Sequence, residues 1–98
     1  MIDGTYQMQI QTPMGFVPVN VTLKTNGNKL SGILEGRGIK EKFENGIVNG
    51  NRLNFKGNFS TMFGKIEYDV NGEVNGNILK VIANTNKGNI KLEGKRKL

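Results

Sequence analysis

Apolar and polar residues alternate with a period of two along most of the chain, and a helical period is nearly absent. Alternation of this kind is typical of strands that bury one face and expose the other to water. The pattern predicts eight short strands, of which the run at 39–43 is the weakest. The predicted strands are residues 6–10, 17–23, 30–34, 39–43, 53–57, 66–70, 79–83 and 90–94.

Tight turns separate these runs. The turn cassette Asn-Gly-Asn-x-Leu occurs at residues 26–30, 49–53 and 75–79, and residues 45–53 match residues 71–79 at an offset of 26 positions. An Asn-Gly pair supplies the two left-handed positions of a type I′ hairpin turn. We therefore expect successive β-hairpins, with breaks at the glycines 27, 46, 50, 72, 76 and 88.

The free edges of such a meander are removed if the sheet closes on itself. We predict an all-β fold, an antiparallel up-and-down meander of about eight short strands closed into a small barrel, with residues 1–98 as one domain. Glycines 32, 36, 57 and 94 fall on the inward face. A glycine there lets the sheet bend or a bulky neighbour cross over it.

Residue usage excludes several kinds of chemistry. The chain contains no Cys, no His and no Trp, so no disulfide, no thiolate nucleophile and no common transition-metal site is expected. Ser31 and Ser60 have no His to activate them. Glu67 and Asp69 share a strand face but have the parity of solvent-facing residues. We therefore expect no enzymatic activity, no metal and no cofactor.

Charge is unevenly distributed. The formal net charge is +6, and the basic residues gather toward the C-terminal end. A short basic end is more often a solubilising tail than a nucleic-acid site, so nucleic acid is not the expected partner. The weaker alternative is an anion or nucleic-acid surface made by Arg37, Lys95, Arg96 and Lys97.

The chain shows no apolar run of membrane-spanning length, and it begins Met-Ile-Asp-Gly without the apolar stretch of an export signal. We therefore expect no membrane partner. The expected location is the cytoplasm, provided that no export signal has been removed from the chain.

The residues predicted to face inward are almost all apolar. An eight-stranded barrel is either filled by these side chains or holds one small ligand. The small size of the domain favours a filled core, whereas a hollow one would bind a small apolar molecule. The candidate ligand-binding residues are Tyr6, Met8, Phe55, Tyr68 and Arg96, with the polar end of a ligand near Tyr6, Tyr68 or Arg96. Met8, Met14 and Met62 are candidates for an adaptable mouth.

Two ends of the chain resemble the calycin superfamily of lipocalins, fatty-acid-binding proteins and avidins. The first strand opens Gly4-Thr5-Tyr6 and the last contains Gly94-Lys95-Arg96. Calycins begin with Gly-x-Trp and end with an Arg that packs across that Trp. The resemblance implies a calycin-like barrel in which Tyr6 replaces the Trp and receives Arg96.

The element Thr12-Pro13-Met14-Gly15 and its altered copy Thr61-Met62-Phe63-Gly64 are similar to a second group. This group comprises small barrel modules found alone or at the ends of bacterial hydrolases. The resemblance implies architecture rather than a particular activity.

The favoured hypothesis is a non-enzymatic small β-barrel binding module that holds a small apolar ligand in its interior. The alternative is a structural or interaction module that docks on a partner or forms a homodimer through its outer face. Ile33, Ile78 and Ile82, on the nominally polar face, are the candidate interface residues.

Overall fold

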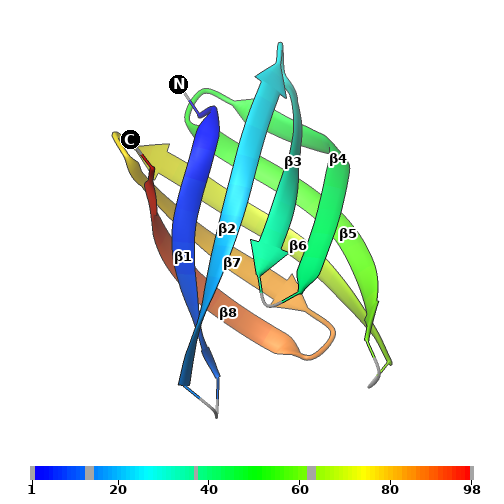
Figure 1. The fold of residues 1–98 in the computed structure, drawn as a ribbon. Coiled ribbons are helices and arrows are strands. Elements are labelled where there is room, and N and C mark those ends of the chain that lie inside the picture. The colour runs from blue at the N-terminus through cyan, green and yellow to red at the C-terminus, as the bar shows by residue number, and fades with distance from the viewer. Residues whose placement is uncertain (1, 13–14, 37, 62–63, 98) are drawn as a thin grey trace.

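The computed structural model describes residues 2–12, 15–36, 38–61 and 64–97 (Figure 1). Over these residues the chain forms eight antiparallel strands that follow one another around a closed barrel. They are β1 (Gly4–Thr12), β2 (Gly15–Asn26), β3 (Lys29–Gly36), β4 (Ile39–Asn49), β5 (Arg52–Thr61), β6 (Gly64–Asn75), β7 (Ile78–Thr85) and β8 (Gly88–Arg96). The predicted fold class is confirmed, and each predicted strand lies within an observed one.

The barrel has the form of two crossing layers. In Figure 1, β1 to β3 and the first part of β4 run steeply in front, while β5 to β8 run diagonally behind them. The barrel closes where β8 pairs with β1, from Tyr6 opposite Arg96 to Met8 opposite Gly94. Within the described ranges no helix is long and apolar enough to cross a membrane.

The three turn cassettes lie at one end of the barrel, which we call the cassette end. Gly27, Gly50 and Gly76, the second residues of the three copies, have φ angles of 63°, 64° and 62°. These left-handed values are the reason why the turns require glycine. The last residue of each copy is a leucine buried in the core: Leu30, Leu53 and Leu79.

The third residue of each cassette makes the same backbone contact. The carbonyls of Asn28, Asn51 and Asn77 accept hydrogen bonds from the N–H groups of Val48, Val74 and Arg96, at 2.9, 2.9 and 2.8 Å. Each bond extends the ladder between the two strands that follow the turn by one residue, into the turn itself. The sequence repeat is therefore also a repeat of structure.

Two glycines expected at breaks lie inside strands instead. Gly46 is within β4 and Gly72 is within β6, so the expectation of turns there was wrong. The cassettes that follow supply the turns, and both glycines face inward where neighbours come close. A Cβ on Gly46 would lie 2.9 Å from the carbonyl oxygen of Asn54, and one on Gly72 would lie 2.6 Å from Cγ1 of Val81.

Other inward glycines are crossed by large side chains, as expected. A Cβ on Gly32 would lie 2.5 Å from Cζ of Phe43, and one on Gly94 would lie 2.5 Å from Cγ of Met8. These distances are shorter than van der Waals contact. Because these two glycines have no side chain, Phe43 and Met8 can pack directly over them in the core.

An irregularity in β4 changes which residues face inward. Gly32 pairs with Phe43 but Leu30 pairs with Gly46, so β4 carries one extra residue there. Such a bulge bends the strand, and Asn45 adopts a left-handed φ of 64° within it. Beyond the bulge, Ile47 pairs with Lys29 on β3 and with Asn54 on β5, and the pairing with β5 continues to Asn49.

Candidate functional site: the barrel interior

The barrel interior contains a cavity of about 350 Å³. Its wall is built from inward side chains of most strands, and nearly all of its exposed atoms are apolar. The cavity opens toward the end opposite the cassettes, because its rim includes residues beside the β3–β4 and β7–β8 turns. The apolar side chains of the wall include Met8, Val21, Leu34, Phe55, Val70, Val81, Ala83, Ile90 and Leu92.

Three of the five predicted ligand-binding residues line this cavity: Met8, Phe55 and Tyr68. All three are buried in the core. Phe55 and Tyr68 make an edge-to-face pair with ring centroids 6.1 Å apart, which fixes the orientation of both rings. Met14 and Met62, the other residues suggested for the mouth, lie outside the described residues.

The remaining two predicted residues, Tyr6 and Arg96, contact each other at the cassette end and do not line the cavity. The Tyr6 hydroxyl donates to the carbonyl of Ile2 at 2.6 Å. It accepts from Nη2 of Arg96 at 2.7 Å and from Nε at 3.1 Å. The guanidinium carbon is 5.3 Å from the Tyr6 ring centroid. The hydrocarbon stem of Arg96 packs over Gly4, where a Cβ would be 3.2 Å from Cγ and Cδ.

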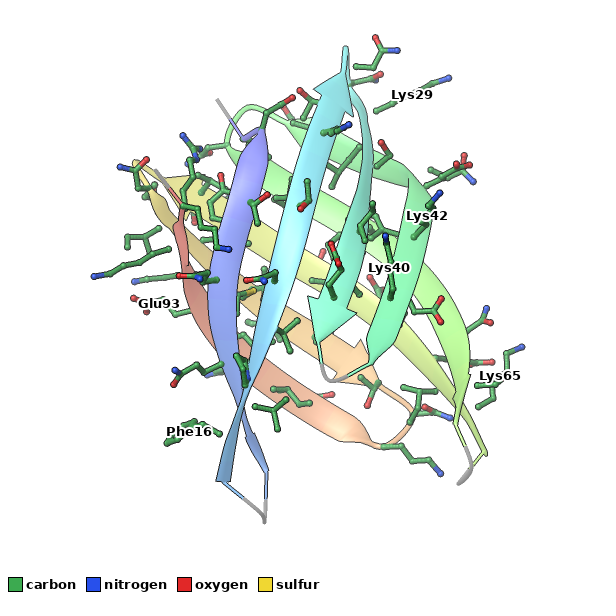
Figure 2. The ribbon with its side chains drawn as sticks, in the orientation of Figure 1. Phe16, Lys29, Lys40, Lys42, Lys65 and Glu93 are labelled. Carbon is green, nitrogen blue, oxygen red and sulfur yellow. The ribbon has the colours of Figure 1, made fainter. Side chains whose placement is uncertain are left out.

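Glu41 is a cavity residue that the sequence interpretation missed. Its charged neighbours Lys40 and Lys42 give this segment the pattern of a surface strand, but Glu41 lines the cavity. Its register partner on β3 is the inward residue Leu34. Lys40 and Lys42 are exposed and project from the outer face of β4 (Figure 2). The sequence contains one sign of this position: Glu41 lies two residues before Phe43, on the same face of the strand, and Phe43 is buried.

Tyr68, on β6, lines the same cavity. Burial raises the pKa of Tyr68 above its ordinary value, and the negative charge of Glu41 raises it further. Both causes act against the tyrosinate. Tyr68 therefore presents a neutral phenol to the cavity at neutral pH, near the carboxylate of Glu41.

The predicted interface residues do not form one surface. Ile33 lies on β3 and both Ile78 and Ile82 lie on β7, and these two strands do not pair. Ile82 is 44% exposed, but its register partners are Asn71 and Lys91. The apolar stripe expected on the outer face is thus divided between two sides of the barrel.

The outer face of β5 to β8 carries a shallow groove of about 690 Å³. A row of alternating charges crosses it, since the register pairs Arg52 with Glu73, Glu73 with Lys80 and Lys80 with Glu93. Glu93 projects outward from β8 in Figure 2. This groove is larger than the interior cavity, but its charged lining makes it less suited to an apolar ligand.

The predicted basic surface is also divided. Lys95 and Lys97 are exposed, whereas Arg96 is engaged with Tyr6. Arg37 lies outside the described residues. The two exposed lysines are the basic residues of this group that remain accessible in the described part of the chain.

Among the described side chains, no three of the metal-binding types come together. No family model, no curated protein and no solved structure matches this chain. The geometry of the interior is therefore the basis on which function is argued.

Proposed function

We propose that this protein is a non-enzymatic β-barrel that binds one small apolar molecule in its interior. The supporting observation is the cavity of about 350 Å³ with an apolar wall. Ligand pockets commonly begin at about 300 Å³ and combine an apolar lining with few polar groups. The polar side chains of this cavity gather toward its open end, which suits a molecule with an apolar body.

The cavity limits the size of the ligand. At the packing density of protein interiors, a volume of about 350 Å³ accommodates roughly 11 to 15 non-hydrogen atoms. A ligand of that size held mainly by apolar contacts should bind with a dissociation constant on the order of micromolar. The chemical class is thus a short-chain lipid or a compound of one or two aromatic rings.

A relationship to the calycins is part of this proposal. Its support is the contact of Arg96 on the last strand with Tyr6 on the first, together with the packing of the arginine stem over Gly4. The resemblance to calycins described in the sequence analysis depends on these same residues. In this chain a phenol takes the place of the indole, and the arginine binds its hydroxyl.

The test is titration with 1-aminonaphthalene, a two-ring probe within this size range that is neutral at about pH 7 and whose emission shifts in apolar surroundings. The native protein should bind it saturably with one site per chain. Ala83 lines the cavity, and Ala83→Phe should fill part of it and weaken binding by about tenfold or more. Asn84 is the exposed next residue on β7, so Asn84→Phe is the matched control and should bind as the native protein does.

Thermal unfolding must show that both variants are folded. Absence of saturable binding to the native protein would refute the proposal. Equal binding by folded Ala83→Phe would place the probe outside the cavity and refute it as well.

Two uses of the outer surface remain predictions. Self-association is supported by the exposure of Ile82, and Ile82→Lys should then lower the mass measured by sedimentation. Binding of an anion or a nucleic acid would depend on Lys95 and Lys97, and it should weaken steeply with added salt.

A further inference from the structure

Four ionisable side chains are found in the wall and rim of the cavity: Glu35, Glu41, Tyr68 and Lys87. Two are acidic, one is a phenol and one is basic. We propose that the cavity is selective for an apolar molecule that carries a positively charged amine at one end, bound at Glu41. This inference rests on the proposed function, because it concerns the ligand of the same cavity.

The position of Glu41 supports a role at the end of the ligand. Phe43, two residues further along β4, is buried in the core. Glu41 is the next inward residue toward the open end, opposite Leu34. A molecule whose body contacts Phe55 and Leu34 would therefore bring its open-end group to Glu41. Glu35, next to the β3–β4 turn, also lies at the rim, where its register partner on β4 is the exposed Lys40.

The cavity is poorly suited to a carboxylate ligand. Arg96, the cation among the predicted ligand-binding residues, donates to Tyr6 at the cassette end and does not line the cavity. The remaining cation is Lys87, which is exposed on the β7–β8 turn. A fatty acid would instead place its negative charge beside Glu41, where the two charges repel each other.

An ammonium group matches the polar atoms that are present. It donates three hydrogen bonds, and the Glu41 carboxylate accepts with the added strength of a charged pair. The phenol oxygen of Tyr68, held neutral in this wall, offers a further acceptor. The apolar surroundings strengthen such a contact because they lower the local dielectric constant.

The experiment compares three ten-carbon molecules that differ only at one end: decylamine, decanol and decanoate. Each displaces 1-aminonaphthalene from the native protein at about pH 7, where decylamine is protonated and decanoate is ionised. Decylamine should bind about tenfold more tightly than decanol, and decanoate should bind most weakly.

The variant Glu41→Gln keeps the shape of the side chain and removes its charge. It should weaken decylamine binding about tenfold, leave decanol unchanged and strengthen decanoate. Glu44→Gln is the matched control, because Glu44 is exposed on the same strand and does not line the cavity. It should leave all three affinities unchanged. If Glu41→Gln does not fold, Lys87→Gln replaces it and should strengthen decylamine relative to decanoate.

The outcomes separate this inference from the proposed function. Equal or tighter binding of decanoate by the native protein would overturn the amine preference, and so would an unchanged ratio of decylamine affinity to decanoate affinity in the variant used. In either case saturable probe binding would still support an apolar ligand. Failure of the probe to bind would overturn both proposals.

Discussion

The rings of Phe43 and Phe55 stack with their centroids 3.9 Å apart and their planes 9° apart. This contact joins β4 to β5, which pair at the cassette end over Ile47–Asn54, Val48–Leu53 and Asn49–Arg52. Phe43 lies before the β4 bulge, outside the stretch over which β4 pairs with β5. The stacked rings thus hold the two strands together where backbone pairing has ended.

Phe43→Leu should weaken this contact between β4 and β5. It removes the aromatic stack and part of the buried volume, and we expect it to lower the free energy of unfolding by about 1 to 2 kcal/mol. Amide hydrogen exchange should also accelerate at residues 40–43 of β4. Phe16 is 63% exposed on the outer surface (Figure 2), so Phe16→Leu is the control. If both variants lost equal stability, the stack would have no special role.

The fit of Tyr68 over Gly57 gives a second prediction. A Cβ on Gly57 would lie 2.6 Å from Cζ of the Tyr68 ring, and the closest atoms around that position all belong to Tyr68. Gly57→Ala should therefore push the ring into the cavity, lower stability by about 1 to 3 kcal/mol and weaken probe binding.

A double-mutant cycle with Tyr68→Leu tests whether the clash with the Tyr68 ring causes the loss of stability in Gly57→Ala. Removing the ring should relieve the clash, so the two changes should be non-additive by about 1 kcal/mol or more. Additive effects would mean that Gly57 is needed for its backbone freedom rather than for the space it leaves to Tyr68.

Much of this fold could be predicted from the sequence because period-two alternation and turn chemistry agree with one another. The cassettes carry both signals, an Asn-Gly turn and an inward leucine such as Leu79. The same reasoning failed at Gly46 and Gly72, since an Asn-Gly pair reads as a turn wherever it occurs. Whether it turns or continues a strand depends on neighbours such as Asn54 and Val81, which local sequence does not reveal.

The cavity was harder to predict than the barrel. The alternation along the strands correctly assigns Met8, Phe55 and Tyr68 to the inward face. It does not give the distance between opposite walls of the barrel. Glu41 was missed because its charged neighbours Lys40 and Lys42 suggested a surface segment. Tyr6 and Arg96 have inward parity as well, but they meet at the cassette end and so lie outside the ligand space.

Arg96 provides a third prediction. Its backbone N–H bonds the third residue of a cassette, as those of Val48 and Val74 do in the other two repeats. Its guanidinium joins β8 to Tyr6 on β1 across a closure of three residue pairs. Arg96→Met keeps an apolar stem over Gly4 and removes the charged hydrogen bonds. We expect a loss of about 1.5 to 3 kcal/mol in unfolding free energy.

Lys95→Met serves as the control for Arg96→Met, because Lys95 is exposed on the same strand. It should change stability by less than about 0.5 kcal/mol. Probe affinity should be nearly unchanged in both folded variants, since neither residue lines the cavity. A large loss of probe binding in folded Arg96→Met would contradict the placement of Arg96 outside the ligand space.

The ionisation of Tyr68 gives the last prediction, and it tests how Glu41 and Tyr68 lie in the cavity wall. The pKa of Tyr68 is raised above 10.0, mainly by burial and further by the charge of Glu41. A raised pKa in the folded state means that the neutral phenol stabilises the fold below the unfolded pKa, and that this contribution is lost as pH rises through the folded pKa.

Alkaline titration followed by tyrosinate absorbance measures this pKa, and the transition missing from Tyr68→Phe identifies it. Glu41→Gln should lower the pKa part of the way toward 10.0, because burial, the larger cause, remains. Glu44→Gln should leave it unchanged. The native protein should also lose stability in alkali more steeply than Tyr68→Phe. An unshifted pKa in folded Glu41→Gln would mean that the carboxylate lies too far from the phenol for both to bind one ligand end.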